Sequence, residues 1–468
     1  MRAVVVAQDG ASSVAAVEPY RTFVPDDAAP FGREFDSREL QESLIRLMAA
    51  AGDDIAAVAF AGQREGIAFV DEGGQALFAS PNVDARASVE GIATDAARGG
   101  DVYATTGHLP SLMQAPAKLA WLRQHRPEVA ASVRHVLPLV DWLAMLLTGT
   151  PAMSRTLAAE NGLLDVTRDC VPSALLDVLG LPALHVADVV PDGSVAGAVR
   201  EGALAARPVV VAGADTQCAL LGMGVVAPGQ AGVPAGWSAP VQAVTSAPVF
   251  DAERRTWTSV HAVPGRWILE SNAGETGRAW EWMCSMMAVN QDEADRLALA
   301  APAGSRDALS VLGPRAMRAS QMTAGVGAIT FPLPLVMSAP QRGDMLRSAL
   351  EAAAYAIRAN LEQIEAVSSA AVARLALGGG MSRSALLAQI LADVVDRPVD
   401  VARTPETSAL GAAMLAFAAI GTYGSIAEAM EAMAPGGRIV VPRAADSAEY
   451  EDYYMRWCQL SDHMAEAN

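Results

Sequence analysis

The stretch of residues 374–421 constrains the fold more than any other part of the chain. Residues 375–377 form a short apolar run that leads into three consecutive glycines. Apolar residues with helical spacing follow, then a second β-type run at 399–401, then another helical segment. Strand, glycine turn, helix, strand and helix make an α/β unit. Its glycine turn allows a ligand to approach the backbone closely beside a helix N-terminus.

Side chains next to this turn predict where its helices begin. The glycines themselves are Gly378, Gly379 and Gly380. Ser382 is the expected N-cap of the first helix, and Thr404 is the expected N-cap of the second, with Pro405 in its first turn. An isolated run of three glycines can also serve only to make a tight turn.

The run GGGMSRSALLAQILADVVDRPV, followed by ETSALGAAMLA, resembles the adenosine-binding segment of the FGGY carbohydrate kinases, which include xylulokinases and glycerol kinases. This family belongs to the actin, sugar kinase and Hsp70 superfold. The resemblance implies an α/β fold of two ribonuclease-H-like domains around a central cleft, with residues 1–226 binding sugar and residues 227–468 binding nucleotide. It implies ATP and Mg²⁺ as cofactors. Adenosine would be held by Gly378, Gly379, Gly380 and Ser382.

Composition limits the classes of partner and the compartment. The 468 residues suffice for two domains, and the net charge of −18 argues against a nucleic acid or an anionic membrane surface as partner. Four cysteines without a CxxC pair indicate a reducing compartment, and the scattered histidines predict no metal site. We find neither a signal-peptide pattern nor a long apolar run, so we expect a cytoplasmic protein. The family suggests a homodimer.

Asp215 is the candidate catalytic residue. It follows an apolar β-type run at 208–211. A hydroxyl group that attacks a phosphate must lose a proton to a nearby base, and a carboxylate at a strand end can accept it. The family resemblance implies this role for Asp215. The alternative role is the N-cap of a helix at 216–222, and one carboxylate can fill both roles. Gln217 is a candidate for contact with substrate.

Two further segments carry candidates for substrate binding. Arg64 and Glu65 come just after a buried strand at 55–60, at the end where α/β folds bind ligands. The pair is similar to one in the glycerol-kinase branch that binds substrate hydroxyls, which favours a polyol or a ketose. The alternative is an exposed ion pair on a loop. Asp84 lies in a segment that resembles the family motif W-x-D-x-R, with Asn82 in place of the tryptophan.

Two hairpins match the phosphate-binding hairpins of the family, and both differ from the family pattern. The first keeps the glycine of D-x-G-T but has Gln8 and Ala11 at the Asp and Thr positions. The second, usually G-T-S, has Trp237 in the middle. The resemblance implies that phosphate is bound by Gly10, Ser12, Gly236 and Ser238.

The function implied is ATP-dependent phosphorylation of a hydroxyl group on a small sugar or polyol. The altered hairpins leave an alternative, in which a catalytically impaired homologue acts as a ligand-binding or regulatory protein. Losing one oriented charge-stabilising group commonly costs about 3 kcal/mol in catalysis. In this alternative Trp237 fills the phosphate site, unless Trp237 is simply a core residue.

Overall fold

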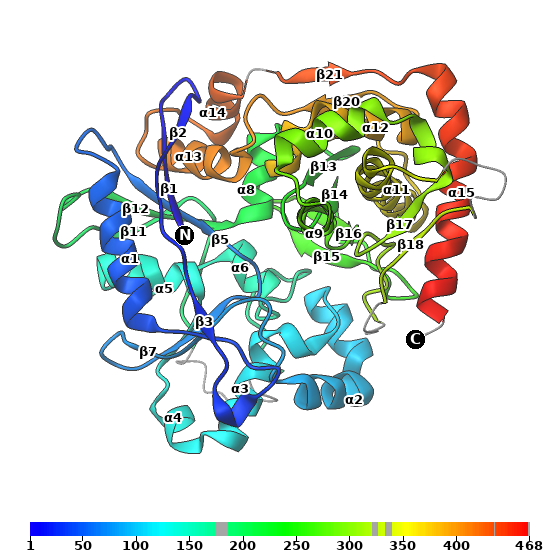
Figure 1. The fold of residues 1–468 in the computed structure, drawn as a ribbon. Coiled ribbons are helices and arrows are strands. Elements are labelled where there is room, and N and C mark those ends of the chain that lie inside the picture. Colours follow the sequence, from blue (N-terminus) through cyan, green and yellow to red (C-terminus); the bar gives the residue numbers. More distant parts are fainter. Residues whose placement is uncertain (175–185, 321–325, 333–338, 435, 467–468) are drawn as a thin grey trace.

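The computed structural model describes residues 1–174, 186–320, 326–332, 339–434 and 436–466. Figure 1 shows two α/β halves: the first half of the chain fills the left and lower part, and most of the second half fills the upper right. The connection between α8 (Asp215–Gly222) and β13 (Gln230–Pro234) joins the two halves. The domain boundary expected at 226/227 falls in this connection and stays a prediction.

The first half contains several small sheets. β5 (Val58–Gly62) runs parallel to β12 (Pro208–Ala214), and β12 pairs with β11 (Ser194–Ala198). A second sheet has the order β7 (Ala76–Ser80), β6 (Ile67–Val70), β8 (His135–Pro138). The remaining pairs are β1 (Arg2–Val6) with β2 (Ser12–Val17), β3 (Thr22–Phe23) with β4 (Glu34–Phe35), and β9 (Met153–Ser154) with β10 (Val189–Val190).

Helices surround these sheets. They are α1 (Ser37–Ala50), α2 (Ser88–Thr106), α3 (Ala115–His125), α4 (Pro127–Ser132), α5 (Leu139–Thr148) and α6 (Arg155–Glu160). All four residues of β6 are buried, because this apolar strand lies between two others. Asp36 caps α1 by accepting hydrogen bonds from the backbone N–H groups of Arg38 and Glu39.

A seven-stranded sheet organises the second half. Its order is β15 (Trp257–Val260), β16 (Trp267–Asn272), β14 (Pro240–Thr245), β13, β19 (Arg374–Gly378), β20 (Val399–Val401), β21 (Arg438–Val440). The central strands β13, β19 and β20 are parallel, and the outer pairs are antiparallel. A separate pair joins β17 (Leu309–Val311) and β18 (Ala328–Thr330).

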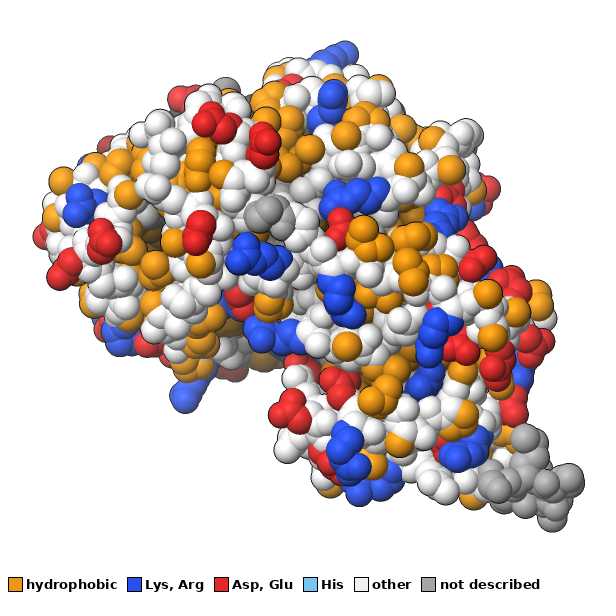
Figure 2. Space-filling view, turned by 90° about the horizontal axis from the view of Figure 1, so that it is seen from above, with side chains coloured by type: hydrophobic (Ala, Val, Ile, Leu, Met, Phe, Trp, Pro, Cys, Tyr) orange, Lys and Arg blue, Asp and Glu red, His pale blue; other side chains and the backbone are white. Residues whose placement is uncertain are grey.

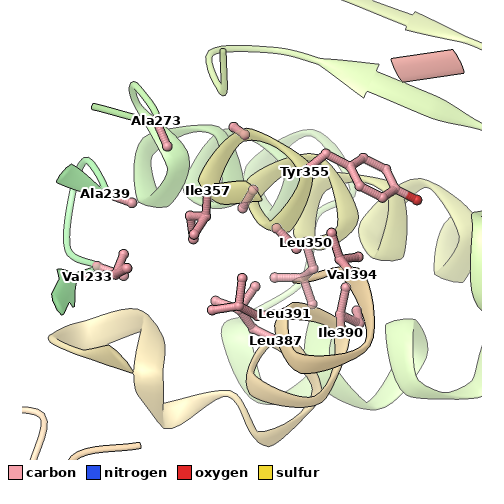
Figure 3. Packing of buried hydrophobic residues seen from close by; sticks show 14 of the residues in the cluster. Val233, Ala239, Ala273, Leu350, Tyr355, Ile357, Leu387, Ile390, Leu391 and Val394 are labelled. Carbon is pink, nitrogen blue, oxygen red and sulfur yellow. The ribbon is translucent and has the colours of Figure 1, made fainter. Parts of the chain in front are cut away.

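The long helix α11 (Arg342–Ser368) covers this sheet together with α12 (Ala385–Val395). Figure 3 shows Ile357 and Leu350 of α11 and Leu387 and Leu391 of α12 around one core, with Val233 facing them from the sheet. The other helices of this half are α9 (Thr276–Met286), α10 (Gln291–Ala300), α13 (Thr407–Ala419), α14 (Ile426–Met433) and α15 (Ala444–Glu466).

Two of these late helices return to the first half. α13 and α14 lie beside α8 and the β1–β2 hairpin (Figure 1) and share a buried cluster with Ala212, Cys218 and Leu221. A Cβ added at Gly411 of α13 would lie 1.8 Å from the carbonyl oxygen of Cys218. Only glycine permits this close approach of α13 to α8.

The strands predicted at 375–377 and 399–401 are confirmed, but both predicted N-caps are wrong. A 3₁₀ turn at Gly380–Arg383 follows the glycines, so α12 begins later and Ser384 caps it. α13 begins after Glu406, and the Thr404 hydroxyl accepts a hydrogen bond from the backbone of Glu406 outside the helix. The spacing of apolar residues in the sequence did not reveal these extra turns before the helices.

Acidic and basic side chains are interspersed on the face shown in Figure 2. The basic side chains on that face do not line up in a stripe. Among the described residues, none of the helices has the length and apolar character needed to cross a membrane.

Candidate active site

Two predicted site segments meet at the ends of adjacent parallel strands. Gly62 of β5 pairs with Ala214 of β12, so the loop with Arg64 and the start of α8 at Asp215 lie at the same sheet edge. This is where α/β folds commonly bind ligands. Asp215 is the first residue of α8 rather than its N-cap, which is Ala214.

Arg64 joins the two halves of the chain at this edge. Its Nη1 lies 2.6 Å from Oε2 of Glu270, on β16, and 3.4 Å from Oε2 of Glu160, at the end of α6. The guanidinium carbon lies 5.6 Å from the centre of the Trp257 ring. Burial lowers the pKa of Arg64, but the carboxylates of Glu270 and Glu160 outweigh it and raise this pKa above its ordinary value. The guanidinium therefore stays charged.

Glu160 is fully buried and accepts hydrogen bonds from several side chains. Gln217 Nε2 donates at 2.5 Å and Ser259 Oγ at 2.7 Å, while His108 Nε2 lies 3.3 Å away. Burial alone would raise the pKa of Glu160, but Arg64 and His108 outweigh it and hold the pKa at about 2. Glu160 is thus an anion at neutral pH that orients Gln217 and Arg64.

Glu270 completes the arrangement from the second half. Gln242 Nε2 donates to Glu270 Oε2 at 2.7 Å and lies 3.4 Å from the Thr216 hydroxyl, next to Asp215. Asn272 Nδ2 donates to the other oxygen of Glu270 at 3.4 Å. Side chains from β14 and β16 therefore meet the start of α8.

Burial raises the pKa of Asp215 to about 6, Glu160 adds to this shift, and Arg64 opposes it. A carboxylate with this pKa is ionised at neutral pH and is a better proton acceptor than an ordinary aspartate. A pKa in this range is what a general base needs at neutral pH. Burial likewise raises the pKa of Glu65, with Arg64 opposing.

Asp84, a predicted substrate contact, lies in a buried structural network. Both of its oxygens lie 2.9 Å from Nε of Arg86, and one accepts a hydrogen bond from the backbone of Arg33. Arg86 also pairs with Glu34 at 2.6 Å. These contacts support the loop, and direct binding of substrate by Asp84 stays a prediction.

The two predicted phosphate hairpins line different cavities. Gly10 and Ser12 line a cavity of about 740 Å³ beside α14, and the Ser12 hydroxyl lies 3.3 Å from that of Thr404. Gly236 lines a groove of about 250 Å³. The N–H of Gly236 donates to the carbonyl of Ser238 within the second hairpin.

The second groove contains part of the predicted nucleotide segment. It is lined by Gly236, Trp237, Gly277, Trp280, Glu281, Gln291, Asp295, Leu350, Gly380, Met381, Arg383 and Ser384. A Cβ added at Gly236 or Gly380 would meet no atom within 4 Å, so the backbone at both positions faces open space. Trp237 is 50% exposed, which excludes the core alternative for this residue.

The other glycines of this segment serve packing. A Cβ at Gly379 would lie 2.5 Å from the Ala235 carbonyl oxygen, and one at Gly378 would lie 2.7 Å from the Met223 sulfur. Ser382 donates its hydroxyl to the carbonyl of Gly379 at 2.7 Å. Over the described ranges, no group of three or more His, Cys, Asp or Glu side chains could hold a metal ion.

Sequence reasoning missed Glu160, Glu270, His108, Gln242 and Ser259. Glu160 is the one charged residue in the mostly apolar run TLAAENGLL, and a lone carboxylate in such a run needs a buried partner. This pattern could have identified Glu160 as a candidate site residue from the sequence.

Comparisons of the chain with protein families and with curated proteins identify the same kind of protein. The family model "FGGY family of carbohydrate kinases, N-terminal domain" matches residues 2–222, and its C-terminal counterpart matches residues 234–420. An autoinducer-2 kinase from Escherichia coli O9:H4 (strain HS) is 31% identical over 466 residues, covering 93% of this chain and 86% of that protein.

Solved structures show the same fold. A ligand-bound xylulose kinase from Lactobacillus acidophilus has a TM-score of 0.84 at 18% identity, covering 99% of this chain and 95% of that one. A glycerol kinase from Plasmodium falciparum with ADP has a TM-score of 0.83 at 17% identity, covering 98% and 95%. The predicted two-domain fold is confirmed.

Replacing Glu160 with alanine should lower the free energy of unfolding by about 3–5 kcal/mol, because Arg64 and His108 lose a buried counter-charge. The loss should be present above about pH 4.5, the ordinary glutamate pKa, and disappear as the pH falls toward 2, where Glu160 becomes protonated in the folded protein. Urea unfolding at several pH values measures it. The exposed Glu72→Ala is the control, and equal stability of both variants at pH 7 would contradict this account.

Proposed function

The chain belongs to the FGGY family of carbohydrate kinases, and we propose that it transfers the γ-phosphoryl group of ATP to a hydroxyl group of a small sugar or polyol. The observation that carries this proposal is Asp215, a carboxylate with a raised pKa at the carboxyl end of β12, facing the charged cluster around Arg64. The comparisons with known proteins give no support to the alternative of an impaired regulatory homologue.

Asp215 would act as the general base. It would accept the proton of the attacking hydroxyl as that oxygen approaches phosphorus. Because the pKa of Asp215 is about 6, the residue is mostly ionised at pH 7 and can return the proton to solvent afterwards.

Arg64, Glu65 and Gln217 would orient the acceptor. Arg64 interacts electrostatically with both Asp215 and Glu65, and Glu160 fixes the directions of Arg64 and Gln217. A pair of hydroxyl groups suits this set, because a guanidinium and an amide N–H donate while a carboxylate accepts. Asp84 would contribute by supporting its loop through the ion pair with Arg86.

ATP would bind in the groove lined by Gly236 and Gly380, where exposed backbone and Arg383 can meet phosphate and ribose. When bound with the nucleotide, Mg²⁺ would neutralise phosphate charge. It needs few protein ligands, since it commonly keeps several waters and binds through phosphates and one or two carboxylates. Gly378, Gly379 and Ser382 would shape the turn beneath adenosine, while Gly10 and Ser12 remain candidate phosphate contacts.

The acceptor belongs among small hydroxylated carbonyl compounds and polyols. A short panel of acceptor compounds follows from the names of similar proteins, which are autoinducer-2 kinase, xylulose kinase and glycerol kinase. Autoinducer-2, xylulose and glycerol should each be assayed with MgATP by release of ADP.

The free cysteines Cys170, Cys218, Cys284 and Cys458 support a cytoplasmic location. We extend the proposal to a homodimer on the family resemblance, supported by exposed apolar side chains near the N-terminus, including Val17, Tyr20 and Phe31. Light scattering on a sizing column measures this, and a monomer at micromolar concentration contradicts it.

Asp215→Asn should lower kcat by about 10²–10⁴-fold and leave binding of MgATP intact, because it removes only the proton acceptor. In the native protein, kcat should fall about tenfold per pH unit below about pH 6, since protonation removes the base. Steady-state kinetics with the preferred acceptor measures both effects. Asp53→Asn, at an exposed position, is the control, and near-native turnover by Asp215→Asn would contradict the assigned role.

Trp237 is half-exposed at the edge of the groove, so we expect it to leave the nucleotide site open. Calorimetry should give a micromolar Kd for MgATP, and Trp237→Thr should change it by less than about tenfold. Trp282→Thr is a matched control, because Trp282 is 45% exposed on α9. Binding by Trp237→Thr without binding by the native protein would instead support the regulatory alternative.

A further inference from the structure

Lys118 is the only lysine in the chain, among 34 lysine and arginine residues. It lies on α3, and its side chain is fully buried. Lysine is seldom fully buried, because an ammonium group loses its hydration there. All other Lys and Arg positions of the sequence are arginine, and only this buried position is lysine. This choice indicates that the ammonium group itself is needed here.

The ammonium joins two loops of the candidate site. Lys118 Nζ donates to the carbonyl oxygen of Glu65 at 2.9 Å and to that of Pro81 at 3.3 Å. The first loop carries Arg64 and Glu65, and the second leads to Asp84 and its pair with Arg86. A compact ammonium directs separate N–H bonds to two carbonyls, whereas a planar guanidinium needs more room.

The backbone of Glu65 requires support at this point. Its φ of 60° is in the left-handed region, which is unfavourable for a residue with a Cβ. Such a conformation persists only where surrounding contacts impose it. Lys118 holds the Glu65 carbonyl, and the N–H of Leu139 donates to the next carbonyl, that of Gly66, at 3.0 Å. The side chains of Arg64 and Glu65 depend on this backbone direction.

The charges around Lys118 also connect it to the site. Burial lowers its pKa to about 8, whereas Asp84 and Glu65 raise it and Arg86 lowers it. At neutral pH the ammonium is therefore mostly charged, and one acidic residue from each of the two loops it joins favours this charge.

We propose that Lys118 is a positioning residue for substrate recognition, which holds the loop of residues 63–66 so that Arg64 and Glu65 face the acceptor. This inference rests on the proposed function for its kinetic consequence, but the loop contact exists without turnover. The test therefore has one readout that needs no substrate.

Hydrogen exchange without ligand is that readout. Lys118→Met keeps the bulk of the side chain and removes its donors, so peptides covering residues 61–70 should exchange at least about tenfold faster than in the native protein. Lys118→Gln keeps two N–H donors and should restore much of the protection. Equal exchange in all three proteins would overturn the proposal even if the kinase activity is confirmed.

Kinetics with the preferred acceptor gives the second readout. Lys118→Met should raise KM by about tenfold or more and lower kcat less, because the loop binds the acceptor and Asp215 is untouched. Lys118→Gln should lie closer to the native KM. An unchanged KM in Lys118→Met overturns the proposal. If the native protein shows no turnover, the proposed function fails while hydrogen exchange still decides the role of Lys118.

The single lysine also permits a test on the native protein, should Lys118→Met fail to fold. A sample with ¹⁵N in its lysine side chain gives one Nζ signal. We expect slow proton exchange and a titration near pH 8, as for a buried ammonium. A signal with rapid exchange and the pKa of a free lysine would show that the loop contact is not formed, and would overturn the proposal.

Discussion

The guanidinium group of Arg64 links the two halves of this protein at the candidate site. Arg64 comes from the loop after β5, and its charge lies between Glu160 of the first half and Glu270 of the second. Buried ions are costly unless they are paired and their remaining hydrogen-bonding groups are used. Here both carboxylates accept further hydrogen bonds, Glu160 from Gln217 and Ser259, and Glu270 from Gln242. Protein side chains therefore compensate both carboxylate charges.

The properties of Asp215 follow from this arrangement. Burial and Glu160 favour its protonated form, and Arg64 favours its ionised form, so its pKa is about 6. If Arg64 were absent, the carboxyl group would lose its main stabilising charge and stay protonated at higher pH. Because Glu270 belongs to the second half, any opening of the two halves would separate Arg64 from one of its partners. Under the proposed function, closure of the two halves would therefore favour the ionised form of Asp215.

The sequence predicted the parts of this site that depend on local order. Arg64 and Asp215 could be placed because each follows a β-type run, and parallel strands bring their carboxyl ends together. Glu160 and Glu270 could not be placed in the same way, since Arg64 and Glu270 are 206 residues apart and only the packing of the halves brings them together. Both helix starts were missed by two residues, because a 3₁₀ turn at Gly380–Arg383 and the residues before Thr407 have no clear local signal. Asp84 was predicted to contact substrate, and this stays a prediction; the sequence did not show that Arg86 engages both of its oxygens.

The most direct test of the central claim is to follow phosphorus during turnover. ³¹P NMR of the native protein with MgATP and each acceptor of the panel resolves ADP, inorganic phosphate and a phosphate ester in one spectrum. The account predicts that a new phosphate ester appears with at least one acceptor, in step with ADP. Spectra in which ATP stays intact with every acceptor, or gives only ADP and inorganic phosphate, would contradict the claim that Asp215 and the Arg64 cluster form a phosphoryl-transfer site.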